Sequence, residues 1–220
     1  DKFAKDKIIA FYRPEKGHKF AFITWGGMIG VVSGMNDQGL VVTLNAAKSE
    51  IPGSSKTPVS ILARQILQYA ANIEEAYEIA GNSETFVAES FLISSAADNK
   101  TVVIEKSPDD MALYDPGGDH LILTNHFQSK TFKDTELCQK NIAEGASMYR
   151  WERTRQLMES GSNFDPHSMA QLLREQNGLG GDSIGMGNEK AINQLIAHHS
   201  VIFKPSELKM WVSTAPYQLG

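Results

Sequence analysis

The sequence has only one cysteine among its 220 residues, Cys138. A single thiol excludes an intramolecular disulfide and a cysteine metal cluster. Cys138 stands in TELCQKN (135–141), a predicted helix, where we expect a thiol that packs in the fold rather than a reactive group. Long apolar runs are also missing, since none approaches the roughly 18 residues that a membrane span requires. The sequence therefore predicts no membrane span.

Basic residues are fewer than acidic ones, and two common catalytic or phosphate-binding motifs are absent. Lys and Arg number 21 against 26 Asp and Glu, a net charge of −5, which disfavours nucleic acid as a partner. No GxxxxGK[ST] phosphate loop and no GxSxG nucleophile elbow is present. The adjacent His198 and His199 stand at a predicted strand start and would point to opposite faces, which makes a poor chelate. A metal-dependent hydrolase that uses these histidines is therefore the least favoured hypothesis for the function. Elemental analysis for bound metal would decide it.

The remaining composition, 41% hydrophobic and 21% charged, is typical of a globular protein. Strand-like and helix-like segments do not alternate regularly along the chain. This order favours antiparallel sheets with helices on their outer faces, an α+β fold. The predicted strands are 7–13, 19–25, 28–36, 40–46, 90–96, 100–107, 110–115, 120–125 and a hairpin at 200–214, and the main predicted helices are 59–70, 73–82, 147–160, 166–177 and 189–198.

Two predicted apolar strands end in an asparagine, LVVTLNA (40–46) at Asn45 and HLILTN (120–125) at Asn125. Alternation places each amide on the same face as residues that we expect to be partly buried. A buried amide without partners costs on the order of 1–3 kcal/mol, so each asparagine either caps a neighbouring loop or serves a ligand. The functional hypothesis is an oxyanion hole, because an amide NH2 donates a hydrogen bond without carrying charge.

Three arginines lie in the predicted helix SMYRWERTRQLM (147–158). Arg153 and Arg155 are predicted to be solvated helix arginines, and Glu152 is placed to pair with Arg155. Met148, Trp151 and Met158 form an apolar stripe along this helix. Arg150 lies away from that stripe but in line with Leu157, so the prediction leaves both burial and exposure of Arg150 open.

Several of these motifs together resemble one superfamily. GMIGVVSGMNDQGLVVTLNAAKS (27–49), LTNHF, YRWERTRQL and LKMWVSTAP resemble, in the same order, segments of the choloylglycine hydrolase, penicillin V acylase and acyl-coenzyme A:6-aminopenicillanic acid acyltransferase superfamily, closest to the acyltransferase-like branch. The resemblance implies a four-layer α-β-β-α sandwich of two antiparallel sheets, the N-terminal-nucleophile hydrolase fold. Residues 1–220 would form most of one such domain without its nucleophile strand, incomplete at both ends.

The resemblance also implies an activity: hydrolysis or acyl transfer at the linear C–N amide bond of a small-molecule N-acyl substrate, with no cofactor or metal. Asn45 matches the asparagine of the family's oxyanion hole, and Asn125 matches a second asparagine near the nucleophile. Arg150 aligns with the active-site arginine, and Arg153 competes for that place. The sequence leaves the oligomeric state open and is compatible with a homo-oligomer.

The sequence departs from the family at the nucleophile. Relatives begin, after autoproteolytic processing, with a cysteine whose α-amine is the base, and an Arg/Asn-x-Asp segment follows soon after. Neither occurs here, Asp1 cannot act as the nucleophile, and Cys138 lies in the wrong element. We therefore expect an upstream segment that carries the cysteine. The alternative is a noncatalytic relative that keeps the same fold as a ligand-binding module.

Overall fold

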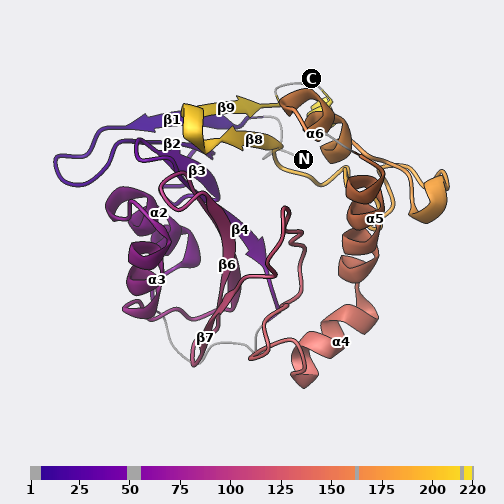
Figure 1. Ribbon diagram of the computed structural model, residues 1–220, viewed down its shortest axis with the longest axis horizontal. Coiled ribbons are helices and arrows are strands. Elements are labelled where there is room, and N and C mark those ends of the chain that lie inside the picture. Colours follow the sequence, from indigo (N-terminus) through magenta and orange to yellow (C-terminus); the bar gives the residue numbers. More distant parts are fainter. Residues whose placement is uncertain (1–5, 49–55, 162–163, 214–215, 220) are drawn as a thin grey trace.

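The computed structural model describes residues 6–48, 56–161, 164–213 and 216–219 of the chain. A large antiparallel sheet stands between two groups of helices, with α2 and α3 on one face and α4, α5 and α6 beyond the other (Figure 1). The small β8–β9 hairpin lies on the α6 side of the sheet. This arrangement confirms the predicted α+β sandwich of two antiparallel sheets.

The larger sheet has seven strands that pair in sequence order, each antiparallel to the next. Neighbouring antiparallel strands can be joined by short turns, and the one long connection between adjacent strands, from β4 to β5, carries α2 and α3. Its strands are β1 Ile8–Tyr12, β2 Phe20–Thr24, β3 Ser33–Asn36, β4 Leu40–Ala46, β5 Glu89–Ser95, β6 Lys100–Lys106 and β7 Met111–Tyr114, and the second sheet pairs β8 Val201–Lys204 with β9 Lys209–Val212.

The helices α3, α4 and α6 begin at a residue whose side chain caps the first turn. Asn72 accepts a hydrogen bond from the Glu75 backbone N–H at the start of α3, and Asp165 and Ser168 form a reciprocal capping box at α6. Pro58 directly precedes α2, as predicted. The helices are α2 Val59–Tyr69, α3 Ile73–Gly81, α4 Glu136–Glu144, α5 Ser147–Ser160 and α6 Pro166–Leu173, with short 3₁₀ turns at Leu179–Gly181, Pro205–Glu207 and Pro216–Gln218.

The main hydrophobic core lies between the larger sheet and α2–α3. In β4, Leu40 and Val42 are fully buried in this core, while the alternate residues Thr43 and Asn45 point to the opposite face. The alternation predicted for this strand is thus confirmed. It assigns one face of β4 to packing and leaves the other face available for a site.

A buried asparagine holds the β3–β4 turn in place. The Oδ1 atom of Asn36 accepts from the backbone N–H groups of Gln38 (3.1 Å) and Leu40 (2.9 Å), and its Nδ2 donates to the carbonyls of Leu67 (2.9 Å) and Ala70 (2.7 Å). Gly39 closes the turn with a positive φ of 74°. The GMNxxGL motif is therefore a turn that is bonded to the end of α2, and it fixes the position of β4.

The segment 120–125 is not a strand, which corrects the prediction. Figure 1 shows it as an extended stretch between the sheet and α5. Its backbone groups find side-chain partners instead of a strand ladder: the Ile122 carbonyl accepts from Gln128 Nε2 and Trp151 Nε1, and the Asn125 carbonyl accepts from Asn141 Nδ2 at 2.6 Å. These partners satisfy two of the backbone carbonyls that a strand would have paired.

Two helix predictions near the C-terminal end also need correction. The predicted helix 166–177 stops at Leu173, and the Glu175 carboxylate accepts from the backbone N–H groups of Gln176 and Asn177. Residues 189–198 form turns and no helix. There the side chain of Gln194 bonds the carbonyls of Glu189 and Ala191, which provides an alternative to helical bonding.

Cys138 occupies the predicted packing position. It is buried in α4 within a second apolar cluster with Ala88, Phe127 and Phe132. Burial raises the pKa of the Cys138 thiol above its usual range. Throughout the described part of the chain, no helix combines the length and the apolar character that crossing a membrane requires.

Candidate functional site

Asn45, Asn125 and Arg150 line one pocket of about 340 Å³, here called the amide pocket. Asn45 comes from the end of β4, Asn125 from the extended segment and Arg150 from α5. The three predicted site residues thus meet from three separate elements. The rest of the wall is mainly apolar, with Leu92, Leu123, Met158, Met169, Leu172 and Ile192 among its members.

The side-chain amide of Asn125 has a fixed orientation. Arg150 Nη2 donates to Asn125 Oδ1 at 2.6 Å, and Asn125 Nδ2 donates to the Ala46 carbonyl at 3.1 Å. Because guanidinium nitrogens can only donate, the amide oxygen must face Arg150. The NH2 group therefore faces β4, beside Asn45.

Arg150 links the extended segment to the stretch around Glu189. Besides Asn125, its Nη1 donates to the Glu189 carbonyl at 2.7 Å. Desolvation lowers the pKa of Arg150, yet a guanidinium stays protonated in proteins. The pocket thus holds a partly buried positive charge that is directed at the amide of Asn125.

Asn45 differs from Asn125 because its side chain has no hydrogen-bond partner among the residues that the structure describes. It also lines an adjoining pocket of about 300 Å³, which includes Ser33, Thr43, His199 and Gln218. The Asn45 amide therefore stands where an apolar pocket meets a more polar one. Its NH2 group is available to a ligand in either.

The other arginines of α5 do not line the amide pocket. Arg153 is only 9% exposed and pairs with Glu175 at 2.9 Å, which corrects the prediction of a solvated side chain. Arg155 follows the prediction, since it is partly exposed and pairs with Glu152. Of the two arginines that competed for the family position, the structure places Arg150 in the pocket.

Three residues behind Asn125 were not singled out from the sequence. Thr124, His126 and Ser147 form a small hydrogen-bonded group, in which His126 and Ser147 are buried. Burial, and then the charge of Arg150, lowers the pKa of His126, so its ring is neutral at pH 7. The sequence feature that could have identified Ser147 is its spacing from Arg150. Ser147 precedes Arg150 by three residues, so both lie on one helix face.

The paired histidines are held by the protein itself. The rings of His198 and His199 both lie edge-on to Trp25, with centroids 5.7 and 5.9 Å from it. His199 Nε2 lies 2.8 Å from Ser33 Oγ, and burial lowers the pKa of His199 to about 4. In the described ranges, no group of three or more His, Cys, Asp or Glu residues is placed to hold a metal ion.

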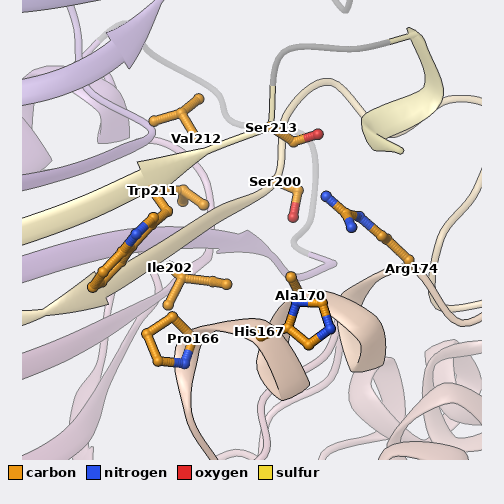
Figure 2. A pocket seen from close by; sticks show the side chains of 10 residues that line it. Pro166, His167, Ala170, Arg174, Ser200, Ile202, Trp211, Val212 and Ser213 are labelled. Carbon is orange, nitrogen blue, oxygen red and sulfur yellow. The ribbon is translucent and has the colours of Figure 1, made fainter. Parts of the chain in front are cut away.

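Another pocket, of about 400 Å³, lies between α6 and the β8–β9 hairpin (Figure 2). Pro166, Ile202 and Trp211 form its apolar side. Two of its polar side chains have partners in the protein: Arg174 Nε donates to the Gln218 carbonyl, and His167 contacts Gln171. Neither Asn45 nor Asn125 lines this pocket, so the amide pocket is the candidate site.

Solved structures with this fold include the following two. A Caenorhabditis elegans N-acylethanolamine-hydrolyzing acid amidase ortholog is 22% identical, with a TM-score of 0.56 over 76% of this chain and 73% of that one. A variant of the conjugated bile acid hydrolase from Clostridium perfringens is 14% identical, with a TM-score of 0.53 over 81% of this chain and 75% of that one. A comparison with curated proteins found no match.

A family match covers almost all of the chain. Residues 3–215 match the family described as acyl-coenzyme A:6-aminopenicillanic acid acyl-transferase. The match includes β4, the extended segment and α5, the three elements that build the amide pocket. The chain belongs to the acyl-coenzyme A:6-aminopenicillanic acid acyl-transferase family.

Proposed function

We propose that the protein is a hydrolase or acyltransferase that acts on the linear C–N amide bond of a small N-acyl molecule. The observation that carries this proposal is the convergence of Asn45, Asn125 and Arg150 on one pocket. Of these three residues, only Asn45 has a side chain without a hydrogen-bond partner among the described residues. It is therefore the residue best placed to donate a hydrogen bond to a substrate carbonyl oxygen.

The proposed nucleophile is a cysteine at the start of an upstream segment. Its α-amine takes the thiol proton, and the thiolate attacks the amide carbon to form a tetrahedral oxyanion. Asn45 stabilises that oxyanion, while Asn125 and Arg150 position the nucleophile. The intermediate collapses with loss of the amine, which takes the proton from the α-ammonium. Water or an acceptor amine then attacks the thioester and releases the acyl group.

The properties of Cys138 support an upstream nucleophile. Its thiol packs against Phe127 and Phe132 and does not line the amide pocket. Its raised pKa keeps it protonated, and a protonated thiol is a poor nucleophile. An attacking thiolate at Asn45 would have to come from another segment.

The pocket walls favour an apolar acyl group joined to a more polar amine. The amide pocket is mostly apolar, whereas the adjoining pocket includes Ser33, Thr43 and Gln218. The solved structures with this fold include an N-acylethanolamine-hydrolyzing amidase and a conjugated bile acid hydrolase. An amide that spans the two pockets would place its C–N bond beside Asn45.

The alternative is a ligand-binding module without catalysis. It is favoured by the absence of any thiol among the residues that line the amide pocket. The two functions differ in what precedes Asp1, because only the enzyme needs an in-frame cysteine there.

The decisive experiment is intact-mass analysis and N-terminal sequencing of the native protein, combined with an amidase assay on N-acyl amines. We expect a cysteine-led segment and turnover that is lost when this cysteine is replaced by alanine. Binding of N-acyl amines without turnover, in a protein that has no such cysteine, would favour the binding module and contradict the proposal.

A further inference from the structure

One hydroxyl contacts three consecutive residues of the segment that carries Asn125. The Ser147 Oγ atom accepts the backbone N–H of Asn125 at 2.7 Å and donates to Thr124 Oγ1 at 3.0 Å. It also lies 2.8 Å from His126 Nδ1. Thr124 Oγ1 and His126 Nδ1 are 3.1 Å apart, so the three side chains form a closed triangle.

Two of the three side chains are buried, while Thr124 is half-buried at the wall of the amide pocket. Ser147 is 3% exposed and His126 is 4% exposed. Hydrogen bonds in such a place are stronger than in solvent, and a buried partner left unpaired is costly. The segment therefore has little freedom to shift at Asn125.

The same helix also holds the Asn125 side chain. Ser147 is the first residue of α5, and Arg150 follows three residues later on the same face. Ser147 thus bonds the Asn125 backbone while Arg150 bonds Oδ1. With Asn125 Nδ2 on the Ala46 carbonyl, α5 sets the spacing between the Asn125 amide and Asn45 of β4.

We infer that Ser147 is a positioning residue, which acts through the backbone of Asn125 to place its amide in the reacting site. This inference rests on the proposed function. A purely structural serine at a helix start would contribute to stability alone. A positioning serine also controls kcat, because small displacements at a site cost far more in rate than in stability.

The test is Ser147→Ala in the full-length native protein. We expect kcat to fall by roughly 10- to 100-fold with KM little changed, since the groups that contact the acyl chain are untouched. Ser83→Ala is the matched control. It removes a half-buried hydroxyl that donates to the Ile79 carbonyl at the end of α3, on the other face of the larger sheet, and should lower the Tm without changing kcat.

Ser147→Cys separates hydrogen bonding from packing. It keeps nearly the same shape but offers only a weak donor and acceptor, so kcat should fall as in the alanine variant. If the alanine variant does not fold, the cysteine variant can be measured in its place. A cysteine variant with normal kcat would show that packing alone matters and would overturn the inference.

Hydrogen exchange at the Asn125 backbone amide gives a readout independent of turnover. The inference expects this amide to be protected in the native protein and to exchange at least about tenfold faster after Ser147→Ala, with α5 itself unchanged. Unchanged protection would refute it. If the native protein hydrolyses no amide at all, the proposed function fails, and the exchange measurement still decides whether Ser147 holds Asn125.

Discussion

At the scale of single residues, Asn45 and Asn125 show how the same side chain can have different tasks. The Asn125 Oδ1 atom accepts a hydrogen bond from Arg150, and its Nδ2 donates one to the Ala46 carbonyl, so this side chain is fixed by other parts of the protein. Asn45 has no such partner among the described residues and faces two adjoining pockets. The side-chain amide of Asn45 is therefore the one that can donate a hydrogen bond to the oxyanion of a transition state.

Replacement of Asn45 by alanine should therefore affect catalysis more than folding. In the active native protein, Asn45→Ala should lower kcat roughly 10²–10³-fold, as loss of one oxyanion donor does in other enzymes. Steady-state kinetics and a Tm measurement would check this, with the exposed Asn82→Ala as the control. Normal turnover by a correctly folded Asn45→Ala variant would rule out the oxyanion role.

Glu89 offers a test of stability at the residue scale. It lies on the α2–α3 face of β5, and its Oε1 has no hydrogen-bond partner among the described residues. Burial raises the pKa of Glu89 to about 8. From about pH 4.5 to 8 the folded protein keeps a proton that the unfolded chain has lost, so stability should decrease as the pH rises, by at most about 1.4 kcal/mol per pH unit.

Glu89→Gln removes this titration while keeping the shape of the side chain. The variant should gain stability relative to the native protein from pH 5 to pH 8, and the difference should level off above pH 8. Denaturant unfolding across this pH range measures it, with the exposed Glu74→Gln as the matched control. A stability difference that does not change with pH would show that Glu89 is ionised in the folded state.

At the scale of elements, the β3–β4 turn determines where Asn45 lies. Asn36 satisfies two backbone N–H groups of the turn and two carbonyls at the end of α2. Gly39 has no room for a side chain, since an added Cβ would approach Ala96 Cβ to 2.7 Å. The turn thus joins β4 to the helical layer on the opposite face from the site.

Asn36→Ala should be among the most destabilising changes in the sheet. It leaves buried N–H and carbonyl groups without partners, so we expect a loss of about 3 kcal/mol of unfolding free energy. Urea unfolding would measure the loss, and the exposed Asn82→Ala should change stability by less than about 0.5 kcal/mol. Equal effects of the two substitutions would contradict the role given to Asn36.

At the scale of the whole molecule, the amide pocket exists because two halves of the chain close on each other. β4 belongs to the first half, while the extended segment, α5 and the stretch around Glu189 belong to the second (Figure 1). Lys7 Nζ also bonds the Ser213 carbonyl, which links β1 to the far end of the sequence. Function should therefore depend on the complete set of contacts.

Residues 1–220 expressed alone should show no amide turnover, because no thiol lines the amide pocket. We also expect this chain to fold poorly without the proposed upstream segment, since the β8–β9 sheet has two strands in the described part of the chain and such a pair is marginally stable by itself. Circular dichroism and an amidase assay, with the cysteine-led native protein as the positive control, test both points. Robust turnover by residues 1–220 alone would require a different nucleophile.

The sequence by itself determined the features that depend on neighbouring residues. Alternation along 40–46, apolar spacing in 59–70 and the GMNDQGL turn each depend on local geometry, and the structure has all three. The family resemblance predicts Asn45, Asn125 and Arg150 as site residues; the structure brings them to one pocket, and their catalytic roles stay predictions. A local pattern suffices where partners are close in the sequence.

Only the tertiary structure decided the features whose partners are distant in the chain. Residues 120–125 have an apolar, strand-like pattern, but side chains of α4 and α5 take their backbone hydrogen bonds. Arg153 is buried because Glu175 lies opposite, and Ser147 matters because the Asn125 backbone N–H points at it. The physical reason is common to all three: a hydrogen bond or ion pair depends on distance in space, and the folded chain alone sets that distance.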